Sequence, residues 1–120
     1  MKILVTAESL DVEGKVDPRF GRARQFALID TESGEVVFIE NSQNLNAPQG
    51  AGIQAAQTAA RHGAQVVITG NVGPKAFTTL SAAGISVCTG ATGTVREAVE
   101  QYQTGQLAEA GGANVEGHWT

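Results

Sequence analysis

The stretch that decides the fold class runs from Gln65 to Ala76 and reads Gln-Val-Val-Ile-Thr-Gly-Asn-Val-Gly-Pro-Lys-Ala. Its first five residues are mostly apolar and β-branched, which is typical of a short strand buried on both faces of a sheet. A glycine turn follows, and Pro74 suits the first turn of a helix. A buried strand, a glycine turn and a helix in this order predict one unit of an α/β fold with a parallel sheet.

The sequence on both sides of this unit supplies the other elements. We expect further strands at residues 2–6, 25–30, 35–41 and 85–88, and helices at about 50–62, 74–83 and 94–103. A polar turn at residues 31–34, with glycine at its end, predicts a hairpin between the second and third strands. Right-handed crossovers make the later strands parallel, so the order β-β-β-α-β-α-β-α predicts a mixed five-stranded sheet flanked by helices. This order resembles the ribonuclease H-like fold.

Length and composition set the limits of the domain. The 120 residues are the size of one domain, and we place a single α/β domain at residues 1–107. Residues 108–120 contain three glycines and little periodicity, which predicts a flexible C-terminal tail.

Charge, cysteine content and the N-terminus narrow the class of protein. The formal net charge of −4 argues against binding to nucleic acid phosphates. The single cysteine, Cys88, excludes an internal disulfide and fits a reducing compartment. The apolar run after Met1 is too short for a signal peptide or a membrane span. We therefore expect a cytoplasmic protein that binds neither nucleic acid nor a membrane.

Three glycine-rich turns precede the three predicted helices, at residues 49–52, 70–73 and 90–93. The latter two follow parallel strands, so they lie at the carboxyl edge of the sheet, where ligands bind in open α/β folds. Helix N-termini there offer unpaired N–H groups and suit an anion. Such turns are also ordinary connectors, and it is their convergence on one edge that favours a site. The candidate contacts from these turns and the loop Asn46–Gly52 are Ala47, Gly50, Ala51, Gly52, Gly70, Asn71, Gly73, Gly90 and Gly93.

Patterns of nucleotide-binding proteins and of hydrolases are missing. The sequence contains neither a Walker-type phosphate loop nor the dinucleotide fingerprint, so nucleotide binding is weakly supported. A metal-dependent nuclease needs clustered carboxylates, and the strand at 2–6 has no acidic residue. No nucleophile elbow is present. We therefore expect a protein that is not an enzyme.

The segment Asp17–Ala23 places Phe20 between two arginines in a predicted loop. Arg19 and Arg22 could pair with an anionic ligand, and Phe20 could act as a hydrophobic lid over it. The other interpretation is that Phe20 plugs the end of the core while the arginines are solvated. The residue types alone favour this second interpretation.

Two residues are candidate metal ligands. Cys88 ends a predicted strand just before a glycine turn, where a thiolate could bind a soft metal. A buried cysteine that packs as a small hydrophobe is the commoner case. His118 lies in the glycine-rich tail and could supply an imidazole to a metal cluster, and the alternative is a disordered chain end.

Several short motifs occur in an order that is similar to one known family. They are Asp17-Pro18-Arg19-Phe20-Gly21-Arg22-Ala23 followed by Phe26, Asn44 with Gly50-Ala51-Gly52, Val67–Ala76, Ala83-Gly84-Ile85, Gly93–Ala98, Gly105-Gln106-Leu107 and the ending Gly117-His118-Trp119. Together they cover nearly the whole chain. On these motifs the sequence resembles the dinitrogenase iron–molybdenum cofactor biosynthesis family.

The resemblance implies a ribonuclease H-like fold without nuclease activity. Family members bind or carry molybdenum- and iron-containing sulfide clusters, and a small member holds a molybdenum–copper sulfide cluster noncovalently. The implied ligand is a molybdenum-containing cluster of the Mo–Fe–S or Mo–Cu–S type, and the implied partners are a cluster-accepting apo-protein or a P-loop ATPase. The larger nitrogenase relatives carry extra domains or extra histidines and cysteines, which this chain lacks.

The residues and the resemblance agree on how a cluster would be held. One cysteine and two histidines cannot wrap a cluster in covalent ligands, so shape, backbone N–H groups, Arg19 and Arg22 must hold it. We therefore expect noncovalent binding or carrying of a molybdenum-containing cluster at the carboxyl edge. The alternative is a metal-free interaction or regulatory module for a partner such as a P-loop ATPase, which an exposed apolar patch around Phe20 and Ala47-Pro48 would favour. Binding of a nucleotide or small anion ranks below both.

Overall fold

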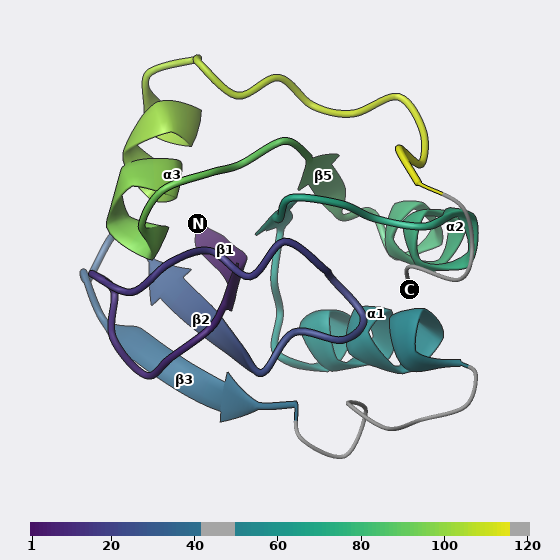
Figure 1. Ribbon diagram of the computed structural model, residues 1–120, viewed down its shortest axis with the longest axis horizontal. Helices are drawn as coiled ribbons and strands as arrows, with labels where there is room; N and C mark the ends of the chain where they lie inside the picture. Colours follow the sequence, from purple (N-terminus) through teal and green to yellow (C-terminus); the bar gives the residue numbers. More distant parts are fainter. Residues whose placement is uncertain (42–49, 116–120) are drawn as a thin grey trace.

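The computed structural model describes residues 1–41 and 50–115. Within these ranges the chain forms a mixed five-stranded sheet and three helices, as predicted (Figure 1). The elements are β1 (Lys2–Ala7), β2 (Gln25–Asp30), β3 (Val36–Glu40), α1 (Ala51–Arg61), β4 (Val66–Ile68), α2 (Pro74–Ala82), β5 (Ser86–Cys88) and α3 (Val95–Gln103). None of these helices is long and apolar enough to cross a membrane.

The sheet joins a hairpin to a parallel half. Its strands lie in the order β3-β2-β1-β4-β5, with β1 antiparallel to β2 and parallel to β4, and β4 parallel to β5. The predicted hairpin is confirmed, because β2 and β3 pair antiparallel with Ile29 opposite Val36. The ribonuclease H-like label remains a prediction.

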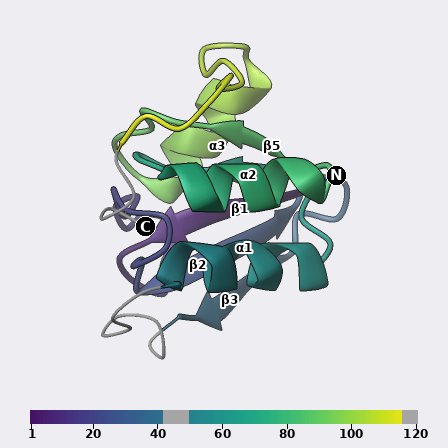
Figure 2. The ribbon, with the colours of Figure 1, turned by 90° about the vertical axis from the view of Figure 1, so that its right-hand side faces the viewer.

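Helices cover both faces of the sheet. Figure 2 shows α1 and α2 side by side on one face, with α3 on the other. Successive side chains of a strand point to opposite faces, so β1 serves two cores at once. Leu4 packs into the core beneath α1 and α2, whereas Ile3 and Val5 pack into the core beneath α3. All three are fully buried, which explains why β1 reads as a continuous apolar run.

One edge of the sheet collects the loops and turns that carry most of the predicted contact residues. β1, β4 and β5 run in the same direction, so their carboxyl ends lie at this edge. The loop at 8–24 leaves β1 there, and the turns at 69–73 and 89–94 lead from β4 and β5 into α2 and α3. α1 ends at the opposite edge, where the Gln65 N–H donates to Lys2 O over 2.8 Å. The N-terminus of α1 therefore lies at the carboxyl edge as well (Figure 2).

Residues 106–115, called the C-terminal strap below, run beside the outer edge of β5. Glu109 forms an antiparallel bridge with Cys88, and the Ala110 N–H donates to Val87 O over 2.7 Å. These contacts cover the edge of β5 that β4 leaves free.

The strap overlaps the predicted flexible tail. The sequence predicts that tail from residue 108, and the structure gives residues 108–115 a defined course along the sheet. Residues 116–120 lie outside the described residues.

Gly70 marks the point where the turn after β4 touches the loop after β1. A Cβ at this position would lie 2.9 Å from both the Cα and the O of Pro18. These are backbone atoms, which cannot swing aside as a side chain can. The close approach therefore requires glycine.

We expect Gly70→Ala to lower the free energy of unfolding by about 1–3 kcal/mol, because the loop must shift to admit the methyl group. Urea unfolding followed by circular dichroism measures this change. Gly112→Ala is the matched control, since nothing lies within 4 Å of a Cβ there and its backbone is outside the left-handed region. Equal stability of the two variants would contradict the packing argument.

Candidate functional site

The segment that carries the predicted arginines, residues 17–24 and called the arginine loop below, is fastened to the ends of β1 and β4. Near the end of β1, Thr6 O accepts a hydrogen bond from the Asp17 N–H over 2.9 Å, and the Thr6 hydroxyl donates to Asp17 O over 2.7 Å. A second hydroxyl, that of Thr69 after β4, lies 2.9 Å from Thr6 Oγ1. Both threonines are fully buried, so water does not compete for these bonds. The pairing of β1 with β4 thus fixes where the loop begins.

The Asp17 carboxylate folds this loop back on itself. It is 5 % exposed, and its oxygens accept hydrogen bonds from the backbone N–H of Arg19 over 3.1 Å and of Arg24 over 3.3 Å. A carboxylate this deeply buried is tolerated only when its oxygens are hydrogen-bonded. The side chains of Arg19 and Arg24 themselves are exposed. The loop therefore presents arginines to solvent from a backbone that is held in place.

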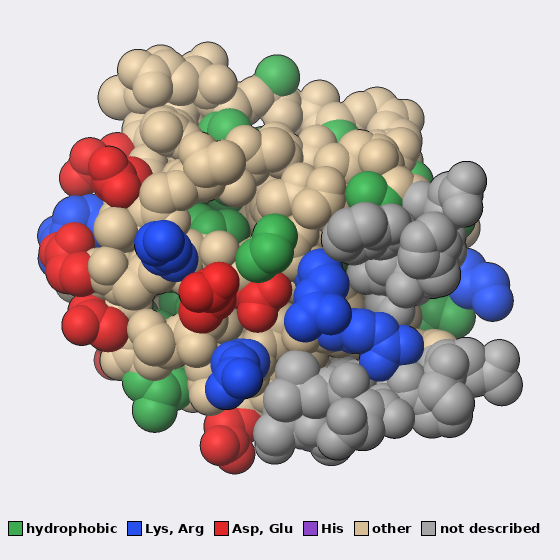
Figure 3. Space-filling view, in the orientation of Figure 1, with side chains coloured by type: hydrophobic (Ala, Val, Ile, Leu, Met, Phe, Trp, Pro, Cys, Tyr) green, Lys and Arg blue, Asp and Glu red, His purple; other side chains and the backbone are tan. Residues whose placement is uncertain are grey.

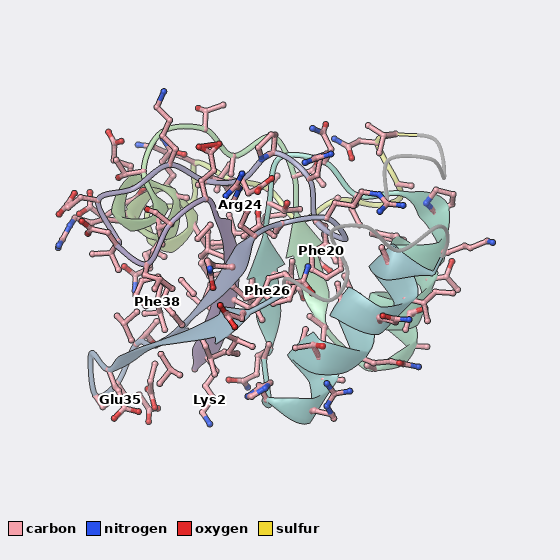
Figure 4. The ribbon with its side chains drawn as sticks, turned by 60° about the horizontal axis from the view of Figure 1, so that its bottom comes forward. Lys2, Phe20, Arg24, Phe26, Glu35 and Phe38 are labelled. Carbon is pink, nitrogen blue, oxygen red and sulfur yellow. The ribbon has the colours of Figure 1, made fainter. Side chains whose placement is uncertain are left out.

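Phe20 anchors the same loop in the core. Its side chain is fully buried, and its ring centroid lies 5.9 Å from that of Phe26 in β2. Figure 4 shows the two side chains together beside α1. This is the position of a core plug, and it leaves no surface of the Phe20 ring for a ligand. The exposed apolar patch expected of an interaction module is not found at Phe20, and Ala47 and Pro48 lie outside the described residues.

Asn71 and Gly70 hold the turn after β4 against the arginine loop. The Asn71 side-chain amide donates to Pro18 O over 2.9 Å, and Asn71 O accepts from the Phe20 N–H over 3.1 Å. Gly70 O accepts from the Gly90 N–H over 2.9 Å. Gly70 and Gly90 are thus linked by a hydrogen bond, and the arginine loop packs against the turn that contains Gly70 and Asn71.

The three helix N-termini at this edge are not equivalent. α3 has a complete capping box, in which the Thr94 hydroxyl accepts from the Glu97 N–H over 3.0 Å and the Glu97 carboxylate accepts from the Thr94 N–H over 2.9 Å. Its first residue, Val95, also donates its N–H to Gly14 O over 3.0 Å. Glu97 lies against Gly93, so the third glycine turn faces a carboxylate of its own chain. An anionic ligand is therefore disfavoured at α3.

α1 and α2 begin differently. Gly50 is the N-cap of α1 in the left-handed conformation, φ 80°, and Gly73 is the N-cap of α2. Among the described residues neither helix has a side-chain cap or an acidic residue in its first turn. Within residues 1–41 and 50–115, no capping side chain compensates the positive dipole ends of these helices, whose first-turn N–H groups include those of Ala51 and Gly52. The sequence-predicted contacts at Gly50, Ala51, Gly52 and Gly73 belong to this pair of helix ends.

Positive charge is concentrated at the same edge. Half of the chain's eight lysines and arginines lie between Lys15 and Arg24, although the protein as a whole is acidic. Figure 3 shows basic side chains on the face that carries the loop, with acidic side chains beside them. An open hollow of about 480 Å³ there is lined by Glu8, Asp17, Pro18, Arg19 and Arg24.

Arg24 is a candidate contact that the sequence reasoning missed. The signal was present, because Arg19, Arg22 and Arg24 fall within six residues of a largely acidic chain. The Asp17 hydrogen bonds bring the end of the loop back beside its start, which the sequence alone does not reveal. Arg22 is half-buried within the same loop.

The candidate metal ligands do not gather. Cys88 is 1 % exposed and packs with Val95 and Ala98 in the core beneath α3, away from the α1 and α2 termini. Burial, and secondarily the Glu109 carboxylate, raises the pKa of the Cys88 thiol. In residues 1–41 and 50–115 no group of three His, Cys, Asp or Glu side chains could hold a metal ion. His118 and Ala47 lie outside those ranges.

Comparison with known proteins gives a consistent result. The model of the dinitrogenase iron–molybdenum cofactor family matches residues 1–105. An uncharacterised protein of Methanocaldococcus jannaschii is 30 % identical over 110 residues, which are 89 % of this chain and 92 % of that protein. The apo form of the orange protein from Desulfovibrio gigas superposes with a TM-score of 0.93 at 45 % identity, over 95 % of this chain and 96 % of that one. A putative NifB protein from Thermotoga superposes with a TM-score of 0.79 at 36 % identity, over 90 % of this chain and 91 % of that one.

The burial of Cys88 predicts a pH dependence of stability. A thiol whose pKa is raised in the folded state stays neutral there, whereas the unfolded chain ionises near the ordinary value of 9.0. The stability that Cys88 contributes is therefore complete below pH 9 and declines as the pH rises through the folded-state pKa. We expect the free energy of unfolding of the wild type to fall relative to Cys88→Ala above pH 9, in denaturant titrations at several pH values. Parallel pH profiles for the two proteins would contradict the assignment.

Proposed function

The chain belongs to the dinitrogenase iron–molybdenum cofactor family, and from that premise we propose that it binds and carries a molybdenum-containing metal–sulfur cluster without acting as an enzyme. The observation that carries the proposal is the meeting of two uncapped helix N-termini with an arginine-bearing loop at one edge of the sheet. Backbone N–H groups and guanidinium groups are the partners that a sulfide cluster with net negative charge requires.

The donor set fits a cluster that is held without a covalent cage. The described residues offer no cluster of metal-ligating side chains, and Cys88 is enclosed in the opposite core. A thiomolybdate-type cluster has its outer valences filled by sulfide, so it needs hydrogen-bond donors and positive charge more than additional ligands. Arg19, Arg22, Arg24 and the first turns of α1 and α2 supply both.

The similarity to the orange protein supports ligand uptake, since the solved structure of that protein is described as an apo form. Mo–Fe–S and Mo–Cu–S clusters are both anionic, so the charge of this edge does not distinguish them. Reconstitution with iron or copper identifies the metals. As a carrier, the protein would pass its cluster to an accepting apo-protein or act together with a P-loop ATPase. The metal-free interaction module ranks second, because Phe20 is buried rather than part of an exposed apolar patch.

The proposal is tested by anaerobic reconstitution of the full chain with tetrathiomolybdate, alone and with copper or iron, followed by desalting. We expect molybdenum to remain with the protein in near-equal amount and to give new visible absorption bands. Heat-denatured protein treated in the same way is the control for adventitious sulfide precipitation. The proposal is overturned if the folded protein retains no molybdenum under any of the three conditions.

Arginine variants then test where the cluster lies. Arg19→Ala and Arg22→Ala should each weaken retention about tenfold, because each removes a charge-assisted hydrogen-bond donor. Arg61→Ala is the matched control, since Arg61 ends α1 at the other edge of the sheet and donates to Thr58 Oγ1 over 3.2 Å. Retention is measured as molybdenum per protein after dilution and desalting. A loss in Arg61→Ala equal to that in the loop variants would refute the placement.

The same assay separates Cys88 from the proposed site. Cys88→Ala should retain the cluster as well as the wild type does, because the thiol faces the core beneath α3. Folding of the variant is checked by circular dichroism before loading. Loss of molybdenum from a folded Cys88→Ala variant would mean that the thiol is a ligand.

A further inference from the structure

Near the end of the C-terminal strap, the side chain of Asn114 forms several hydrogen bonds to the turn between β4 and α2. The Asn114 side-chain oxygen accepts from the Val72 N–H over 2.8 Å, and its amide nitrogen donates to Gly70 O over 3.2 Å. Its backbone N–H donates to Val72 O over 3.1 Å. Both the oxygen and the nitrogen of the Asn114 amide are therefore hydrogen-bonded to the backbone of the turn between β4 and α2.

These bonds act on the turn that positions the N-terminus of α2. Val72 is the residue before Gly73, the N-cap of the helix. A turn of this kind leaves backbone N–H and C=O groups that must find partners. Asn114 satisfies them from outside the turn, so the first turn of α2 is held in one orientation before any ligand arrives. Such pre-organisation lowers the cost of binding.

Asn114 also reaches the arginine loop through a second amide. Its Nδ2 lies 3.2 Å from Asn71 Oδ1, while the Asn71 Nδ2 donates to Pro18 O over 2.9 Å. Because an amide offers an oxygen on one side and a nitrogen on the other, the bond from Asn114 orients Asn71 with its donor toward Pro18. One strap residue thus fixes both the α2 turn and the loop that bears Arg19.

The strap has little else to hold it here. Between Ala110 and Asn114, nothing lies within 4 Å of where a side chain would begin at Gly111 or Gly112. Glycines also lose the most conformational freedom when they are ordered. The attachment of this part of the strap to the carboxyl edge therefore depends on the bonds of Asn114.

We propose that Asn114 is a positioning residue of the ligand-binding edge, which locks the N-terminal turn of α2 and, through Asn71, the arginine loop in the geometry that holds an anionic cluster. This inference rests on the proposed function. The Asn114 side chain is exposed and its bonds go to polar groups of the turn, so its role is separable from the apolar packing of the cores.

The first arm of the test uses the apo protein. In Asn114→Ala we expect the amide hydrogen of Val72 to exchange about tenfold faster than in the wild type, with the amides of β1 and β4 unchanged. Asn114→Asp keeps an acceptor for Val72 but loses the donor to Gly70 O and Asn71 Oδ1, so it should retain protection at Val72. Glu109→Gln changes another strap side chain and should leave this exchange as in the wild type. Unchanged exchange of Val72 in Asn114→Ala overturns the inference.

The second arm uses protein loaded with the tetrathiomolybdate-derived cluster, followed by the decay of its visible absorption after dilution. We expect loss about tenfold faster from Asn114→Ala, and faster loss also from Asn114→Asp despite its protected Val72 amide, because the orientation of Asn71 is lost. Because Asn114→Asp also adds a negative charge that repels an anionic cluster, the decay is repeated at about 1 M salt, where such repulsion is screened. A faster loss that disappears at high salt would contradict the positioning role. If the wild type holds the cluster and both variants hold it equally well, the inference fails alone. If the wild type takes up no cluster, the proposed function fails, and the positioning role fails with it.

Discussion

Parallel pairing of β1 with β4 puts the carboxyl ends of both strands side by side, and the candidate site follows from that placement. It brings the hydroxyls of Thr6 and Thr69 to 2.9 Å from each other in a fully buried position. The arginine loop then starts from a fixed point at Asp17, and Gly70 allows the backbone of this loop to lie directly on the turn after β4. Without this pairing, the arginines and the N-terminus of α2 would have no common location.

The helices on the two faces of the sheet differ in how their N-termini are capped. On the α3 face, the helix end is closed by Thr94 and Glu97, and Cys88 packs in the core beneath the helix. On the other face, α1 and α2 begin at glycines, and no carboxylate lies in either first turn. The chain keeps acidic residues out of these two first turns and places three arginines within six residues of the neighbouring loop, which is the arrangement that the proposed anionic ligand requires. The proposed binding depends on geometry fixed in advance, because the attraction between an exposed arginine and an anion is weak by itself and is screened by salt.

The sequence by itself determined the order of strands and helices, since apolar periodicity, glycine turns and capping residues are local signals. A threonine and a glutamate three residues apart, Thr94 and Glu97, are the residue types of a capping box, and the structure forms one there. The hairpin turn and the alternation of strands with helices were enough to specify a mixed sheet, and with it the edge where its loops meet. The motif at Asp17–Ala23 belongs to the loop that the structure fastens to the carboxyl edge, although its residue types allowed Phe20 to be either a lid or a core plug.

Only the tertiary structure decided what each side chain of that edge does. Whether Phe20 and Cys88 face a ligand or a core depends on which face of the sheet each side chain meets, and no local pattern fixes this for a loop residue or for a strand of three residues. Arg24 joins the site because Asp17 binds both ends of one loop. Asn114 lies 44 positions from Gly70 in a segment without periodicity, so their contact exists only once α3 and the strap have packed along the sheet. Long-range proximity of this kind is set by the packed fold, and single-residue preferences carry no information about it.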